Sequence, residues 1–222
     1  MTSHERVAAA LARQPTDRIP VDFGGTFLSG APAAFQQRMV EVLGLSARPR
    51  DPRYRAFDPR IQEHFGCDLR SLTPAKGANW GIRNVHDAPL GDASIADLER
   101  YPWPQPSDAY AAGLSEEARF LAASGYWVCA SQIGQGIFEL ACYLRGYERI
   151  LYDLVDDCAF VHAFAERALR VNEALNDCYF SVIGPHVDMV LLGDDLATQN
   201  GPYMSPAMFR ELFKPYFASY VA

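Results

Sequence analysis

The chain has 222 residues, of which 49% are hydrophobic and 21% are charged, which is the composition of a globular protein long enough to bury a core. Its formal net charge of -7 provides no general attraction for nucleic acid or for an anionic membrane, so we expect neither as a partner. The opening stretch MTSHERVAAALARQ contains Glu5 and lacks a long apolar core, which argues against a signal peptide or a membrane span and favours a cytoplasmic location.

The first quarter of the chain predicts helices around one short strand. Thr2 and Glu5 match a capping box, in which side chains satisfy the free amides at the start of a helix, and the Ala-rich run to about Arg13 supplies that helix. RIPVDFGG, residues 18–25, predicts a short strand that carries Asp22 and ends at two glycines. Further helices are expected at 32–45 and 58–66, on either side of a Pro- and Arg-rich loop at 48–55.

A second predicted strand and a long loop-rich segment follow. CDLRSLTP, residues 67–74, predicts a strand that carries Asp68. Residues 74–106 are rich in Pro, Gly and Asn and contain one short helical piece at 93–101. Loops of this length in a compact domain usually have a function or form a lid or a small insertion.

Helical patterns dominate the second half of the chain. Residues 107–125 predict a helix with Ser107 as its cap, and 126–136 predict a strand that runs into the glycine-containing turn QIGQG. The remaining helical patterns lie at 136–146, 147–157, 158–183 and 205–222.

The stretch VDMVLLGDDLATQNGPYMSP, residues 187–206, places two carboxylates directly after an apolar run. Val187 to Leu192 is rich in branched side chains and predicts a strand buried on both faces, as in a parallel sheet. Asp194 and Asp195 follow its carboxyl end, which is where ligands bind in parallel α/β folds. The alternative interpretation is that a loop needs polar residues and that Asp favours turns.

The alternation of strands with helices predicts a single α/β domain with a parallel sheet. About four strands are predicted, which is too few to close an eight-stranded barrel. The last helix ends without a glycine or a tail, so we expect the chain to be incomplete at its carboxyl end.

The five cysteines are odd in number and form no C-x-x-C pair, so neither a disulfide framework nor a zinc knuckle is predicted. Cys158 and Cys178 fall in helical patterns, where cysteine commonly behaves as a small buried hydrophobe. We expect reduced thiols.

Four stretches together resemble the uroporphyrinogen decarboxylase superfamily, especially its branch of cobalamin-dependent methyltransferases. They are ERVAAALARQPTDRIPVDFGG, FGCDLRSLTP, IGQGIFELACYLRGYERILYDL and GDDLATQNGPYMSPAMFRELFKPY, and they cover nearly the whole chain in the expected order. The resemblance implies a TIM-type (β/α)8 barrel, of which residues 1–222 would be the amino-terminal two-thirds, with the last strands and helices missing.

The resemblance also implies a substrate cleft at the carboxyl ends of the barrel strands. Asp22, Asp68, Asp194, Asp195 and the turn at 132–136 would face this cleft, with Gln199 beside them. In the decarboxylases the first strand leads into an R-Q-A-G-R motif whose arginines neutralise the carboxylates of the substrate. Here the matching stretch is DFGGTFLSG and contains no arginine, so a polyanionic tetrapyrrole would meet Asp22 instead.

Two further family positions are matched less closely. Asp68 corresponds to an aspartate of the second strand that lies near the pyrrole nitrogens of the substrate, although a strand-end cap would explain it equally well. A substrate tyrosine of the family corresponds to Cys142 or Tyr143, and a helix-face aromatic packed in the core is the alternative for Tyr143.

The methyltransferase branch uses zinc to bind and deprotonate a thiol acceptor, because the thiolate is the species that both ligates and attacks. The expected ligands are an H-x-C pair and a distant Cys, which would lie beyond Ala222. None of the five histidines has a cysteine two residues later, and His86 and His186 lie in loop-like stretches where solvation is the ordinary state. No metal site is therefore predicted within these residues, and zinc and a corrinoid are implied only for the complete protein.

Three hypotheses follow, and no catalytic residue is assigned in any of them. The first is an enzyme that transfers a methyl group between a corrinoid protein and a small molecule, or demethylates a methoxylated or methylamine-like compound, with Asp22, Asp194, Asp195 and Gln199 lining its cleft. The second is uroporphyrinogen decarboxylase in porphyrin biosynthesis, with the missing arginines supplied by Arg145 or by later residues. The third is a non-catalytic truncated fragment, in which exposed strand edges would favour aggregation or pairing.

Overall fold

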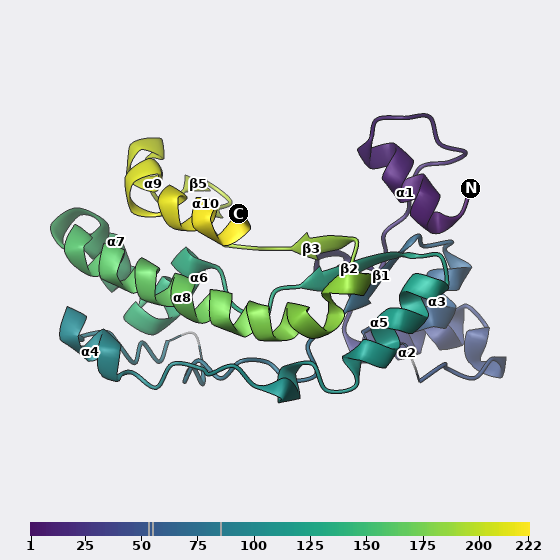
Figure 1. The fold of residues 1–222 in the computed structure, drawn as a ribbon, viewed down its shortest axis with the longest axis horizontal. Helices are drawn as coiled ribbons and strands as arrows, with labels where there is room; N and C mark the ends of the chain where they lie inside the picture. Colours follow the sequence, from purple (N-terminus) through teal and green to yellow (C-terminus); the bar gives the residue numbers. More distant parts are fainter. Residues whose placement is uncertain (53, 55, 85) are drawn as a thin grey trace. The chain divides into compact units, whose positions relative to one another are not determined.

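The structure, a computed structural model, describes residues 1–52, 54, 56–84 and 86–222 and contains one three-stranded parallel sheet (Figure 1). The strands are adjacent in the order β1 (Leu69–Leu72), β2 (Trp127–Ser131) and β3 (Met189–Leu191). Helices lie between successive strands in the chain, because a parallel pair needs a long crossover connection. The predicted α/β class is confirmed.

The chain divides into two compact units. The first comprises Met1–Lys76, Asp108–Gln132 and Tyr179–Leu191 and contains the whole sheet, whereas the second comprises Gly77–Ser107, Ile133–Cys178 and Leu192–Ala222. The single barrel domain expected for residues 1–222 stays a prediction.

Two helices of the first unit pack on opposite faces of the sheet. On one face, Val7 of α1 (Ser3–Leu11) forms a buried cluster with Leu69 and Cys129. On the other face, where pleating places Arg70, lies α5 (Leu114–Ala123). The predicted capping box starts α1, since the Glu5 amide donates to Thr2 Oγ1 at 3.1 Å and the Thr2 amide donates to the Glu5 carboxylate at 2.8 Å.

The remaining helices of the first unit enclose a small core of their own. Val40, Phe57 and Ile61 form it, between α2 (Ala33–Val42) and α3 (Pro59–His64). The loop predicted at 48–55 includes residues 53 and 55, which lie outside the described residues. Single 3-10 turns are η1 (Phe27–Ser29), η2 (Leu45–Ala47), η3 (Asp108–Tyr110) and η4 (Gly184–His186).

The second unit is helical, with one short hairpin. Its core is aromatic, since the Phe138 and Phe213 rings lie 5.4 Å apart and those of Trp103 and Phe164 lie 5.9 Å apart. The long helix α8 begins in this unit and ends in the first. The elements are α4 (Ile95–Arg100), α6 (Ile137–Arg145), α7 (Tyr147–Asp156), α8 (Cys158–Ile183), β4 (Ala197–Thr198), β5 (Gly201–Pro202), α9 (Pro206–Leu212) and α10 (Lys214–Val221).

The strand predicted at 18–25 is absent from the sheet, and that prediction is wrong. A backbone hydrogen bond links it to the sheet region, from the Asp68 amide to the Val21 carbonyl at 2.8 Å. The chain then turns away because the Asp22 carboxylate accepts hydrogen bonds from the Gly25 amide at 2.9 Å and Thr26 Oγ1 at 2.6 Å. Such local bonds from Asp compete with strand pairing.

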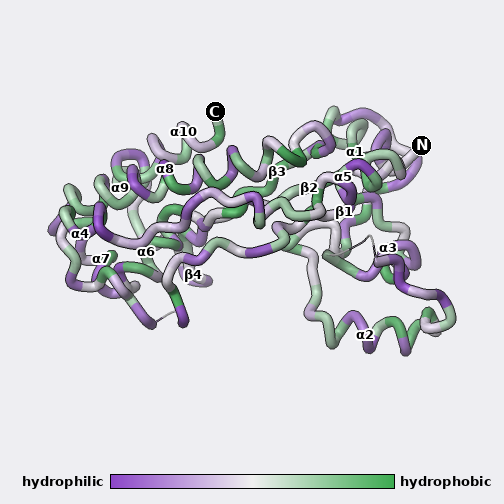
Figure 2. The backbone as a smooth tube through the Cα atoms, turned by 60° about the horizontal axis from the view of Figure 1, so that its bottom comes forward, coloured by the Kyte–Doolittle hydropathy of each residue, from purple (hydrophilic) through white to green (hydrophobic). Residues whose placement is uncertain are grey.

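The expected burial of both faces of β3 is also wrong. Figure 2 shows β3 as hydrophobic along its length, yet Val190 is 44% exposed. β3 is an edge strand of the sheet, so it has a strand neighbour on one side only.

Two predicted helices have different bounds because of Gly and Pro. The helix expected over 107–125 starts at Leu114, since Gly113 adopts a φ of +70° that interrupts it. The helix expected over 205–222 breaks at Phe213, two residues before Pro215, because proline has no amide proton for a helical hydrogen bond and its ring clashes with the carbonyl four residues earlier.

No disulfide joins any of the five cysteines, all of which lie in the described part of the chain. Within residues 1–52, 54, 56–84 and 86–222, no helix is both long and apolar enough to span a bilayer.

Candidate functional site

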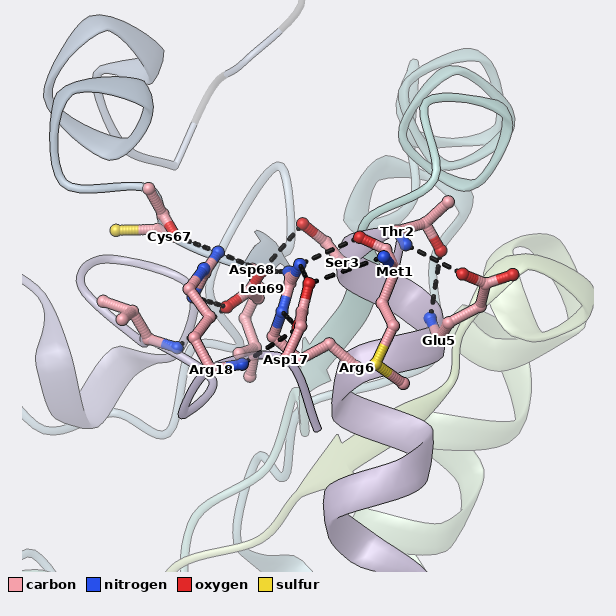
Figure 3. Close-up of polar contacts among 12 residues, drawn as sticks. Met1, Thr2, Ser3, Glu5, Arg6, Asp17, Arg18, Cys67, Asp68 and Leu69 are labelled. Carbon is pink, nitrogen blue, oxygen red and sulfur yellow. Dashed lines mark hydrogen bonds and ion pairs between the residues drawn. The ribbon is translucent and has the colours of Figure 1, made fainter. Parts of the chain in front are cut away.

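Asp68 lies at the amino end of β1, not at the carboxyl end where the family resemblance places a cleft. Its carboxylate, which is fully buried, accepts hydrogen bonds from Arg6 at 2.5 Å and from Arg18 at 2.7 and 2.8 Å (Figure 3). Ser3 Oγ and the Val21 amide donate to it at 2.8 and 2.9 Å. This network ties α1 and the segment after it to the start of the sheet.

The network keeps Asp68 ionised. Burial by itself raises the pKa of this carboxyl, but the hydrogen bonds from Arg18, Val21, Ser3 and Arg6 outweigh it and hold the pKa below its ordinary value. Arg6 also pairs with Asp17 at 2.6 Å, a hydrogen bond that raises the Arg6 pKa. Because every group is paired, the arrangement serves structure rather than ligand capture.

Asp22 has a local structural contact as well. Its two carboxylate oxygens cap the turn at Gly25 and Thr26, as described above, while the residue remains exposed to solvent. Both Asp22 and Asp68 belong to the first unit.

Asp194 occupies a different kind of position, three residues after β3 and at the start of α6. Its carboxylate accepts hydrogen bonds from the Phe138 amide at 2.9 Å and from the Glu139 amide at 2.8 Å, which are free donors in the first turn of that helix. A Cβ atom on Gly136 would overlap this carboxylate, so a residue without a side chain is needed there. Asp194 therefore caps the helix that follows β2 in the chain.

The turn QIGQG is held in place by two buried asparagines of α8. Asn176 Oδ1 accepts from the Ile133 amide at 3.0 Å, and Asn172 Nδ2 donates to the Gln135 carbonyl at 2.9 Å. Asn172 Oδ1 lies against Gly134, where a Cβ atom would collide with it. The turn that precedes α6 is thus bound to α8 at two positions, Ile133 and Gln135.

Glu139 and Tyr143 complete a group that we call the Asp194 cluster: Asp194, Glu139 and Tyr143. The Tyr143 hydroxyl donates to Glu139 Oε1 at 3.0 Å, one helical turn away on α6. Tyr143 is half-buried, so the core-packing interpretation is partly met, but its hydroxyl has a specific acidic partner.

Two carboxyl groups of the Asp194 cluster have raised pKa values. Burial raises the pKa of Asp194 to about 6 in spite of its two backbone hydrogen bonds, and the nearby charges of Glu139 and Asp195 act in the same direction. Burial also raises the pKa of Glu139, partly offset by the hydrogen bond from Tyr143. The pKa of Tyr143 is raised by burial and by its contact with Glu139.

Aromatic rings of the second unit extend the cluster. The ring of Tyr143 lies 6.1 Å from that of Tyr147, which lies 6.3 Å from that of Tyr203. Tyr203 in turn lies 5.5 Å from Phe138. A row of three tyrosine rings therefore begins at Tyr143, the partner of Glu139.

The other predicted site residues of the second unit have no hydrogen bond described within the Asp194 cluster. Asp195 is exposed beside the cluster, close enough for its charge to raise the Glu139 pKa. Gln199 is exposed in the hairpin between β4 and β5. Cys142, the alternative to Tyr143, is buried, and burial raises the pKa of its thiol to about 12, so it remains protonated.

The structure thus brings together Asp194, Asp195 and Tyr143, and adds Glu139, which the sequence analysis did not single out. A signal for Glu139 was present, since it stands three residues after the last glycine of QIGQG, in the first turn of a predicted helix. A protonated Asp194, with its pKa of about 6, can donate a proton near neutral pH, and an ionised carboxylate can hold a cation. Within the described ranges, no three His, Cys, Asp or Glu side chains are grouped so that they could hold a metal ion.

No match to the chain was found among known protein families, curated proteins or solved structures.

Proposed function

We propose that the chain is an enzyme of the uroporphyrinogen decarboxylase superfamily with a partial TIM-type barrel, and that it transfers or removes a methyl group on a small molecule together with a corrinoid protein. The observation that carries the proposal is Asp194, a carboxyl group with a pKa of about 6 placed three residues beyond a parallel strand and beside Glu139. Ligands of parallel α/β folds bind at this end of the strands.

The Asp194 cluster fits the part of demethylation that a protein must supply. When a methyl group is transferred from an ether oxygen or from the nitrogen of an uncharged amine, the bonding electron pair stays on that atom, so negative charge develops there and a proton donor beside it lowers the barrier. Asp194 or Glu139 would donate this proton, while Tyr143 orients Glu139 through its hydrogen bond. General acid catalysis of this kind contributes about 100- to 10,000-fold to a rate.

Decarboxylation of a polyanionic tetrapyrrole is supported less well. Arg145, named as a possible substitute for the missing arginines, is 3% exposed and already donates to Asp153, Leu90 and Ala93. Its guanidinium also lies 3.8 Å from the centre of the Phe160 ring. It therefore has no free face for a substrate carboxylate.

The roles proposed for the chain's own residues do not depend on bound zinc or on a bound corrinoid. The corrinoid would supply the cobalt atom that exchanges the methyl group, and zinc has no candidate ligand group among the described residues. What the chain itself contributes is the proton donor, its orientation by Tyr143 and the fixed turn at 132–136.

The proposal is tested by methyl transfer from labelled substrates. The purified protein is mixed with a corrinoid protein kept in its reduced cobalt(I) state and with a panel of radiolabelled methoxylated arenes and methylated amines, and label on the corrinoid protein is measured. We expect transfer from at least one substrate and a loss of about 100-fold or more for Asp194→Ala. Asp177→Ala, at an exposed position of α8, is the matched control and should leave transfer unchanged.

Two results would contradict the proposal. Formation of coproporphyrinogen from uroporphyrinogen, without label transfer, would identify a decarboxylase. Methyl transfer at the native rate by Asp194→Ala would show that Asp194 takes no part in the reaction.

A further inference from the structure

The second unit contains a cavity that is distinct from the Asp194 cluster. It has a volume of about 580 Å³ and is lined by the segment 146–149 and Tyr152 of α7, and by His86 and Ala88. Ligand pockets in proteins commonly range from about 300 to 1,000 Å³, so this cavity has the size for a small molecule. Tyr147 lines the cavity, and its ring also contacts the ring of Tyr143. Among the described residues, Tyr147 is the only one whose ring contacts link the cavity to the Asp194 cluster.

The walls of the cavity are held together by an ion triad that is centred on a buried aspartate. Asp153 is 1% exposed and pairs with Arg145 at 2.7 Å and with Arg149 at 3.1 Å. Arg145 also donates to the carbonyls of Leu90 and Ala93 at 2.8 and 2.7 Å, which fixes the loop that carries Ala88. The site is therefore formed without a ligand, and a ligand would bind without the cost of ordering these groups.

The cavity presents one cation and one anion beside aromatic rings. The single charge of Asp153 faces two guanidinium groups, so Arg149, whose side chain is 54% exposed, retains positive charge toward solvent. Glu148, the neighbouring residue, supplies the negative charge. Tyr152 stands four residues after Glu148 and three after Arg149, which puts it on the helix surface beside both.

These groups match a ligand that carries both charges. Arg149 can form a paired hydrogen bond with a carboxylate, as guanidinium groups commonly do. The tyrosine rings and Glu148 favour an ammonium group, and aromatic faces bind methylated ammonium ions particularly well because these ions hold few water molecules. A ligand with only one charge would leave Glu148 or Arg149 repelled or unused.

We propose that this cavity binds a small zwitterion with a methylated ammonium group and a carboxylate. The choice of a methylated ligand rests on the proposed methyl transfer, whereas the site and its charge preference do not. The zwitterion occupies the space over Tyr152, with its carboxylate toward Arg149 and its ammonium toward Glu148 and the rings of Tyr147 and Tyr152.

Four probes of nearly equal shape test the proposal by isothermal titration and by chemical-shift changes in the tyrosine rings. They are glycine betaine, which has both charges; choline, which has only the cation; 3,3-dimethylbutyrate, which has only the anion; and 3,3-dimethylbutanol, which has neither. We expect betaine to bind at least about 5-fold more tightly than each of the others, which is a modest difference on the scale of single charged contacts. Because no turnover is measured, this result does not depend on whether the proposed function is right.

Two variants assign the contacts. Arg149→Gln should weaken betaine and dimethylbutyrate and leave choline unchanged, while Glu148→Gln should weaken betaine and choline and leave dimethylbutyrate unchanged. Arg119→Gln, on α5 of the first unit, is the control that should change nothing. Both test residues are exposed, so folding of the variants is expected.

Three outcomes would overturn the proposal. They are a failure of betaine to bind at ~10 mM, equal affinity for betaine and either single-charge probe, and equal betaine binding by the two variants and the control. Betaine binding without methyl transfer from any labelled substrate would support the zwitterion site and contradict the proposed function.

Discussion

Asp68 and Asp194 are both aspartates next to strands of one parallel sheet, yet they differ in charge state and in partners. Asp68 is surrounded by Arg6 and Arg18 and keeps its charge in a fully buried position. Asp194 accepts from two backbone amides and lies near Glu139 and Asp195, and its pKa rises to about 6. Burial acts on both in the same direction, so the neighbouring charges decide the outcome.

The comparison separates a structural carboxylate from a candidate chemical one. A buried charge with matched arginines holds elements together and has no capacity left for a ligand. A carboxyl group that is half-titrated near pH 6 and lacks a cationic partner among the described residues can exchange protons under physiological conditions.

Replacing Asp68 is expected to have the largest effect. Asp68→Asn leaves the guanidinium groups of Arg6 and Arg18 without their shared counter-charge, and breaking a buried pair in this way costs about 3–5 kcal/mol of unfolding free energy. Urea denaturation measures the change, with exposed Asp177→Asn as the control. A loss below about 1 kcal/mol would show that the network is dispensable.

The two aspartates should give opposite dependences of stability on pH. The folded pKa of Asp68 is lowered, so its contribution is present above the unfolded value and is lost as pH falls through the folded pKa. The folded pKa of Asp194 is raised, so its contribution is present below 3.8 and is lost as pH rises through about 6. The shift from 3.8 to about 6 corresponds to at most about 3 kcal/mol.

Unfolding measured from pH 4 to 7 checks this expectation for Asp194. The difference in unfolding free energy between the native protein and Asp194→Asn should change by about 2–3 kcal/mol over this range, since asparagine does not titrate. A carbon NMR titration of Asp194 should have its midpoint near pH 6. If the unfolding free energies of the two proteins changed in parallel with pH, Asp194 would not be the group with the raised pKa.

A methyl group at Gly136 should break the cap that Asp194 provides. Gly136→Ala places Cβ within the Asp194 carboxylate, so either the carboxylate or the start of α6 must move, at a cost of about 2 kcal/mol. Gly77→Ala is the control, because no atom lies within 4 Å of its added Cβ. Thermal unfolding of both variants measures the difference. Equal stability would show that the hydrogen bonds from Asp194 to the start of α6 can be lost without cost.

The smallest effect is expected for the hydroxyl of Tyr143. Tyr143→Phe removes its 3.0 Å hydrogen bond to Glu139, which lowers the Glu139 pKa in the native protein. The variant should lose about 1 kcal/mol of stability and show a higher Glu139 pKa by NMR titration. Tyr152→Phe, at an exposed position of α7, should change neither quantity.

Much of the local structure follows from patterns within short stretches. The capping box of Thr2 and Glu5, the parallel strand that contains Val190 and the helices α6 to α8 are all confirmed. The strand expected at 18–25 failed because the Asp22 side chain bonds to its own turn, and the last helix breaks at Phe213, ahead of Pro215. These failures come from single side chains that override a correct hydrophobic pattern.

The sequence by itself determined the α/β class and the position of Asp194 and Asp195 after a strand, because hydrophobic periodicity and chain order need no long-range information. It could not determine the partners of these residues. The contact of Asp68 with Arg6 and Arg18 joins residues 50 or more positions apart, and that of Asp194 with α6 joins residues at least 55 positions apart. Only the tertiary structure decides which aspartate meets arginines and which meets amides and another acid, and the resulting local electrostatics make Asp68 structural and Asp194 titratable.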